Sequence, residues 1–144
     1  MNTLNDNIVL ECMKYMDEEV LVNFCMTNKK YYHLFFTYYD YLRCDLNKIF
    51  GISVNLCCTN IVKFLIDKGP NRIKSNIDVN YILTKAAGLG NIYIVKLMMK
   101  YDADEVNLAM IKAAKNGHIE IEKLMKKNGA DYFKNEILYK LDLE

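Results

Sequence analysis

Apolar and polar positions follow the same order twice in the second half of the chain. Residues 83–98 align with residues 110–125, which lie 27 positions later, and nine of the aligned residues are identical. In each copy two adjacent alanines precede a glycine, and apolar residues then recur at the spacing of one helix face. The pattern predicts a repeated unit of two short helices. Because such a unit cannot bury its apolar face alone, the copies are expected to stack.

The identities between the two copies indicate specific structural roles. They are Lys85/Lys112, Ala86/Ala113, Ala87/Ala114, Gly90/Gly117, Ile92/Ile119, Ile94/Ile121, Lys96/Lys123, Leu97/Leu124 and Met98/Met125, and Ala103-Asp104 also matches Ala130-Asp131. The paired alanines let the first helix approach a neighbouring helix closely. Gly90 and Gly117 are expected to adopt the left-handed conformation that ends the first helix. Lys96 and Lys100 are expected on the solvent side of the second helix.

A weaker copy precedes these two. Ile61-Val62-Lys63 matches Ile94-Val95-Lys96, which lies 33 positions later, and the first helix of this copy is expected from Ile49 to Leu56. The repeats are therefore expected at about 49–78, 81–104 and 108–131, within residues 42–144. Residues 135–143 are expected to form one last helix that caps the stack.

Residues 49–144 carry the order A-A-x-x-G-H, I-V-x-x-L-L and G-A-D in degenerate form, which resembles the ankyrin repeat. The resemblance implies an all-α fold, a short ankyrin-type helical solenoid that binds other proteins. The family's T-P-L-H opening is replaced by Tyr81-Ile82-Leu83-Thr84 and by Leu108-Ala109-Met110-Ile111. The hydrogen bonds that threonine and histidine normally make between repeats are therefore expected to be missing. Because the 27-residue spacing is shorter than the usual ~33, turn-like fingers are expected in place of β-hairpins.

Residues 4–36 contain three short segments with helical spacing of apolar residues. Asp6, Asp17 and Asn28 are the expected helix caps. The expected apolar faces consist of Ile8, Cys12, Tyr15 and Met16 in the first helix, of Val20, Leu21, Phe24 and Cys25 in the second, and of Tyr31, Tyr32, Leu34, Phe35 and Phe36 in the third. Three such helices form a cluster that is too small to be comfortably stable alone.

The same segment resembles an F-box. Residues 4–17 follow the F-box opening L-P-x-E-I-L-x-x-I-L-x-Y-L-D in unbroken register, and residues 20–34 resemble the rest of the motif. Asn5 stands in place of the family's proline, so the first turn lacks the pre-organisation that proline supplies. The resemblance implies a three-helix, F-box-like cluster over residues 1–41. The alternative is that these helices are only an N-terminal cap on the first repeat.

The F-box resemblance implies a protein partner, the small Skp-type adaptor of a cullin-RING (SCF-type) ubiquitin ligase. The adaptor-binding residues would then be Leu4, Asn5, Ile8, Val9, Cys12 and Met13. The repeats would hold an unknown target protein for ubiquitin transfer. This arrangement resembles the F-box/ankyrin proteins of large DNA viruses and intracellular bacteria.

The alternative function is an ankyrin scaffold, or a viral structural protein, that binds partners without a ligase. Both functions use the surface formed by the first helices of the repeats and by the fingers. The expected target-binding residues on this surface are Lys85, Leu89, Lys112, Lys115 and Asn116, with residues 102–105 at a finger.

Charge and aromatic content change this picture little. Nineteen basic and eighteen acidic residues give a net charge of +1, which is unlike the basic footprint of a nucleic-acid-binding or membrane-surface protein. Seven of the eleven residues from Tyr31 to Tyr41 are aromatic, but this segment contains no lysine or arginine to hold phosphate. We therefore expect a buried junction there, and neither a nucleic-acid nor a membrane partner.

The sequence contains few residue patterns that could bind a metal ion or support catalysis. Its five cysteines (Cys12, Cys25, Cys44, Cys57 and Cys58) include no C-x-x-C pair, and His33 and His118 lie far from any matching ligand set. A metal site is not expected, and the thiols are expected to be reduced in an intracellular, cytoplasmic compartment. Phosphate-binding, dinucleotide-binding and nucleophile motifs are absent, as is an apolar run long enough to span a membrane. We therefore expect no enzymatic activity and no cofactor.

Overall fold

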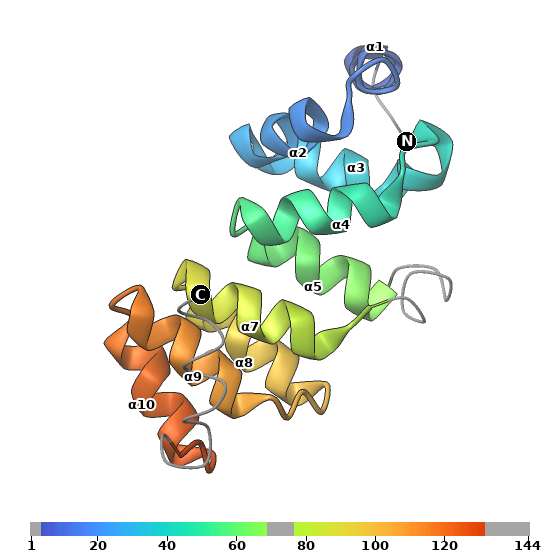
Figure 1. Cartoon of the computed structure of the whole chain (residues 1–144). Coiled ribbons are helices and arrows are strands. Elements are labelled where there is room, and N and C mark those ends of the chain that lie inside the picture. Colours follow the sequence, from blue (N-terminus) through green and yellow to red (C-terminus); the bar gives the residue numbers. More distant parts are fainter. Residues whose placement is uncertain (1–3, 69–76, 132–144) are drawn as a thin grey trace. The chain divides into compact units, whose positions relative to one another are not determined.

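The computed structural model describes residues 4–68 and 77–131. Within these residues the chain forms nine helices and no strand (Figure 1), which confirms the prediction of an all-α helical repeat fold. The chain divides into two compact units, unit 1 (Met1–Lys74) and unit 2 (Ser75–Glu144). The expected capping helix at 135–143 lies outside the described residues.

Unit 1 contains five described helices. They are α1 (Leu4–Met13), α2 (Glu18–Thr27), α3 (Lys29–Leu42), α4 (Leu46–Asn55) and α5 (Thr59–Lys68). Asp17 caps α2 and Asn28 caps α3, as the sequence predicts. Asp45 caps α4, which therefore begins at Leu46 rather than at the expected Ile49.

The first helix differs from the sequence-based prediction in its cap and in its buried face. Asp6 does not cap α1, because the helix begins at Leu4 and Asp6 lies in its first turn. The buried residues of α1 are Asp6, Leu10 and Met13, whereas Ile8, Cys12 and Tyr15 are exposed. The predicted inward face was therefore wrong. In α2 the prediction misplaced one residue, since Val22 is buried and Val20 is 49% exposed.

The aromatic segment packs inside unit 1, as expected for a junction. Phe35 is 1% exposed. The ring of Phe36 on α3 stacks on that of Phe64 on α5, with 3.9 Å between ring centroids, and Tyr39 meets Phe64 edge-on at 5.7 Å. The contact joins the third helix to the second helix of the first repeat. This explains why α3 to α5 lie in one compact unit.

Unit 2 contains two described helix pairs. The first pair is α7 (Val79–Leu89) with α8 (Ile92–Lys100), and the second is α9 (Val106–Lys115) with α10 (Ile119–Lys127). Gly90 and Gly117 follow the first helix of each pair with φ of 78° and 77°, in the predicted left-handed conformation. Local sequence therefore determines where α7 and α9 end.

The helix packing in unit 2 follows the repeated sequence. Ala86, Ala87 and Ala113 are fully buried at 0% exposure, while Lys96 and Lys100 are exposed, both as predicted. Residues 101–105 connect α8 to α9 without a strand, which agrees with the turn-like finger expected from the short repeat.

Candidate functional site

One face of α1 leaves apolar side chains in solvent. Leu4 is 79% exposed and Ile8 is 55% exposed, and Cys12 is also exposed. These residues lie four positions apart, so they stand one above another on one side of the helix. We name them the α1 stripe. Of the other predicted adaptor-binding residues, Asn5 is exposed and Val9 is half-buried beside the stripe.

The opposite face of α1 fixes the helix to the rest of unit 1. Leu10 and Met13 lie in the core at 4% and 1% exposure. Asp6 Oδ1 lies 2.6 Å from Lys30 Nζ, an ion pair that joins α1 to α3. Met13 therefore holds α1 in place and cannot touch a partner without rearrangement, unlike the other predicted adaptor-binding residues.

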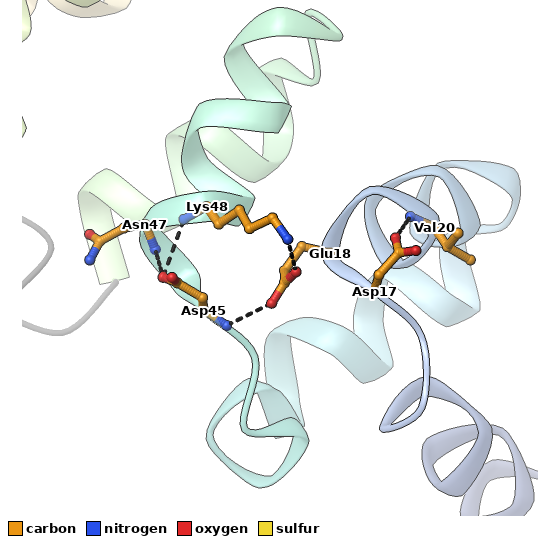
Figure 2. A network of polar contacts seen from close by, with 6 residues as sticks. All are labelled: Asp17, Glu18, Val20, Asp45, Asn47 and Lys48. Atoms are coloured by element: carbon orange, nitrogen blue, oxygen red, sulfur yellow. Dashed lines mark hydrogen bonds and ion pairs between the residues drawn. The ribbon is translucent and has the colours of Figure 1, made fainter.

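A polar network joins α2 to the start of α4 (Figure 2). Lys48 Nζ lies 2.7 Å from Glu18 Oε2, and Glu18 Oε1 accepts a hydrogen bond from the Asp45 amide at 3.3 Å. The hydrogen bond with Lys48 lowers the pKa of Glu18 from its ordinary value of 4.5, and the same bond raises the pKa of Lys48 from 10.5. The network adds a polar link between α2 and α4, which pack against each other.

The first helices of the two pairs in unit 2, α7 and α9, pack side by side. At their starts, Asn80 Oδ1 accepts a hydrogen bond from the Asp104 amide at 2.9 Å. At their ends, the Gly88 carbonyl accepts a hydrogen bond from Asn116 Nδ2 at 3.0 Å and lies 3.1 Å from His118 Nε2. The start of α7 therefore contacts the start of α9, and the end of α7 contacts the end of α9. The two helices run in the same direction and together form one continuous surface.

The expectation of missing bonds concerned only the threonine and histidine of the family's opening motif, and asparagine side chains link the neighbouring repeats here. The Thr84 hydroxyl does donate within its own helix, to the Tyr81 carbonyl. However, Asn107 Oδ1 accepts a hydrogen bond from the Asp131 amide at 2.7 Å, which repeats the contact of Asn80. Asn80 and Asn107 are identical residues 27 positions apart. The repeated asparagine is the feature of the sequence from which these two hydrogen bonds could have been predicted.

Four of the five predicted target-binding residues lie on the surface of α7 and α9 in two matching rows, and the fifth, Lys115, is outside these rows. One row is Tyr81, Lys85 and Leu89 on α7, and the other is Leu108 and Lys112 on α9 with Asn116 directly after it. We name these two rows the inner face. Leu89 is 43% exposed, Asn116 and the neighbouring Lys115 are exposed, and Lys85 and Lys112 are half-buried.

Tyr81 is a surface residue that the sequence analysis missed. It is 56% exposed, and Lys85 Nζ lies 5.5 Å from the centroid of its ring, within reach of a cation–π interaction. Its place four positions before Lys85 on a helix was the available signal. At the finger, Asp102 and Asp104 are exposed, and Asp104 also accepts a hydrogen bond from Asn80 Nδ2 at 3.0 Å.

A cleft of about 610 Å³ opens in unit 1 beside the α2–α3 junction and the turn between α4 and α5. Cys25, Cys57, Cys58 and His33 are among its lining residues. Burial raises the pKa of Cys25 to about 12 and raises the pKa of Cys58 above its ordinary value of 9.0. A raised pKa disfavours the thiolate, which is the form that acts as a nucleophile. These two thiols are therefore poorly suited to covalent chemistry.

Within residues 4–68 and 77–131, no group of three or more His, Cys, Asp or Glu side chains has a geometry that holds a metal ion. None of the helices in the same residues is both long enough and apolar enough to cross a membrane.

The family model for ankyrin repeats (3 copies) matches residues 50–136, which is more than half of the chain. The matched segment begins inside α4 and includes both helix pairs of unit 2. No curated protein and no solved structure matches the chain.

Proposed function

Because the chain belongs to the ankyrin-repeat family, whose members are non-catalytic protein-interaction modules, we propose that it brings a target protein to a ubiquitin ligase. In this proposal the α1 stripe binds the Skp-type adaptor of an SCF-type ligase, and the inner face binds the target. The chain performs no chemistry itself. It raises the effective concentration of the target near the conjugating enzyme.

The exposed apolar stripe on α1 is the observation that carries the adaptor proposal. Apolar side chains that share one exposed helix face are typical of surfaces that a partner protein covers. In α1 the stripe faces solvent because Leu10, Met13 and the Asp6–Lys30 ion pair occupy the other side. A helix held in this way presents the stripe without a prior conformational change, which lowers the cost of binding. The same residues carry the F-box resemblance.

The test is binding of the purified chain to a eukaryotic Skp-type adaptor. Wild type is expected to co-purify with the adaptor, and Ile8→Asp is expected to weaken binding by at least about 2 kcal/mol, or thirtyfold, since it places a carboxylate in an apolar interface. Ile119→Asp is the matched control. Ile119 on α10 is exposed to a similar degree, 61% against 55% for Ile8, so both variants should fold and only one should lose the adaptor.

A second candidate function is a scaffold whose N-terminal helices are only a cap on the repeats. The packing of α2 against α4 and of Phe36 on Phe64 favours it, since both contacts cover the first repeat. In that case wild type does not bind the adaptor, and Ile8→Asp behaves like Ile119→Asp. Absence of binding by wild type would exclude the ligase function and leave the scaffold, and equal binding by the two variants would exclude the α1 stripe as the adaptor site.

A further inference from the structure

The cleft of about 610 Å³ in unit 1 is large enough to hold a small organic molecule. Its lining comes from the end of α2, the start of α3, the turn after α4 and the start of α5. Neither the α1 stripe nor the inner face supplies any of the described residues that line it. The cleft is therefore a separate candidate site, which the adaptor and target proposals leave without a role.

Apolar and sulfur-containing side chains form part of the lining. Cys25, Cys58 and Ile61 line the cleft and are themselves buried. Met26 is 55% exposed, and its Sδ accepts a hydrogen bond from Cys58 Sγ at 2.8 Å, which holds the thioether at the cleft. Thiol and thioether groups are polarizable and pack well against apolar and aromatic groups. The apolar body of a ligand can therefore be covered here.

The charge in the cleft is positive. Lys29 belongs to the lining, and the described lining residues include no aspartate or glutamate. The Lys29 side chain is exposed, and within the described part of the chain it is the neighbouring Lys30 that pairs with Asp6. His33 stands four positions after Lys29 on α3, so the two side chains share one helix face. An anionic group that enters the cleft meets an ammonium group and an imidazole, and no carboxylate of the lining repels it.

Two helices begin at the cleft and add to this charge. Lys29 is the first residue of α3 and Thr59 is the first residue of α5, and both line the cleft. The start of a helix carries a partial positive charge, because the peptide dipoles align along its axis. Burial raises the pKa values of Cys25 and Cys58, so these two thiols stay neutral and do not offset the positive charge.

We propose that the cleft binds a small organic anion, a molecule with one carboxylate or phosphate group attached to an apolar body. The anionic group pairs with the amine of Lys29 beside His33, and the apolar body covers Met26 and the ring of Tyr32. The inference goes beyond the proposed function. It adds a ligand site to unit 1 that requires neither the adaptor nor a target protein.

The test titrates the full-length chain with 1-anilinonaphthalene-8-sulfonate, a fluorescent probe that joins an aromatic body to one sulfonate. The sulfonate stands in for the carboxylate or phosphate of the ligand. The fluorescence is expected to rise to saturation with one probe bound per chain. The neutral analogue N-phenyl-1-naphthylamine has a similar aromatic body and no charge. It should bind at least about tenfold more weakly, because it cannot pair with Lys29.

Competition against the bound probe identifies the anionic group. Octanoate and octyl phosphate have the same alkyl chain and differ in the charged group. The one that displaces the probe at the lower concentration shows whether the site prefers a carboxylate or a phosphate. 1-Octanol has the same chain without a charge and is expected not to displace the probe.

Two pairs of variants locate the binding site. Lys29→Gln should weaken probe binding about tenfold, since it removes the charged partner of the sulfonate. Lys68→Gln is the matched control. Lys68 is exposed at the end of α5, roughly 13 Å along the helix from its start. This separation exceeds the Debye length of about 8 Å at physiological salt, so the control should change the affinity less than about twofold.

The second pair tests the cleft itself. Asn60 is exposed and lines the cleft, so Asn60→Trp places a large ring in it and should abolish saturable binding. Asn23 is exposed on α2 and is not part of the lining, so Asn23→Trp should leave binding unchanged. Circular dichroism checks that all four variants keep the wild-type melting transition.

Several results would overturn the inference. They are the absence of saturable probe binding, equal affinity for the charged and the neutral probe, equal losses in Lys29→Gln and Lys68→Gln, saturable binding that survives Asn60→Trp, and displacement by neither octanoate nor octyl phosphate. All four substitutions lie outside the α1 stripe and the inner face. Any of these results would therefore disprove the ligand site and leave the proposed function to its own test.

Discussion

At the scale of single residues, position 90 requires glycine for two separate reasons. Its φ of 78° lies in the left-handed region that disfavours side chains. A Cβ placed there would lie 2.5 Å from Cε1 of His118, whose ring lies beside Gly90. Gly117 occupies the matching position one repeat later with φ of 77°, but a Cβ there would meet nothing within 4 Å. The two glycines therefore share the backbone requirement and differ in the steric one.

This difference predicts unequal costs for the same substitution. Gly117→Ala should lower the free energy of unfolding by about 1–2 kcal/mol, the cost of a left-handed alanine. Gly90→Ala should cost roughly 1 kcal/mol more, since the His118 ring must move away from the Gly88 carbonyl. Urea denaturation measures both values. In a His118→Ala background the two substitutions should cost the same, and an unchanged gap there would contradict the steric explanation.

At the scale of helices, the sequence predicts where a helix begins and ends better than it predicts which face of the helix is buried. Helix ends depend on local groups, so Asp17, Asn28, Gly90 and Gly117 could be assigned from residue type alone. Asp45 follows the same rule and was overlooked.

The buried face of a helix depends instead on what packs against it. In α1 two faces have apolar residues at helical spacing, and the contacts with α3, including the ion pair of Asp6 with Lys30, decide which one is buried. Those contacts join residues far apart in the chain. The sequence alone therefore could not show that the α1 stripe faces solvent, although the residues of the stripe were among the predicted adaptor-binding residues.

The network between α2 and α4 gives a prediction about pH. The pKa of Glu18 is lowered by Lys48, so its stabilisation is present above the ordinary pKa of 4.5 and is lost as the pH falls through the folded-state pKa. The pKa of Lys48 is raised by Glu18, so its contribution is lost only at high pH, above 10.5. Glu18→Gln should therefore lower the free energy of unfolding at pH 7 and matter progressively less below pH 4.5.

The matched control is Glu19→Gln. Glu18 and Glu19 both lie in the first turn of α2, so both substitutions remove the same favourable interaction with the helix dipole. Because the pair is at the surface, Glu18→Gln should cost only about 0.5 kcal/mol more than the control at pH 7. Chemical denaturation at pH 7 and pH 3 measures the gap, and a gap of the same size at both values would show that the ion pair is not its source.

At the scale of the whole molecule, the two proposed binding surfaces belong to different compact units. Unit 1 carries the α1 stripe and unit 2 carries the inner face of α7 and α9. In unit 1 the surface is held by the core residues on the opposite side of α1, and in unit 2 it is held by the hydrogen bonds of Asn80 and Gly88 at the two ends of the helices. An interaction module needs such pre-formed surfaces, because binding energy is not then spent on ordering them.

The most direct measurement is the alkylation rate of Cys12 by iodoacetamide, followed by mass spectrometry with and without the Skp-type adaptor. Cys12 lies in the α1 stripe, and Cys57 is an exposed internal reference. Both should react faster than Cys25 and Cys44, whose pKa values burial raises to about 12 and about 11. With saturating adaptor, the account predicts that alkylation of Cys12 slows at least about tenfold while that of Cys57 is unchanged. An unchanged Cys12 rate would contradict it.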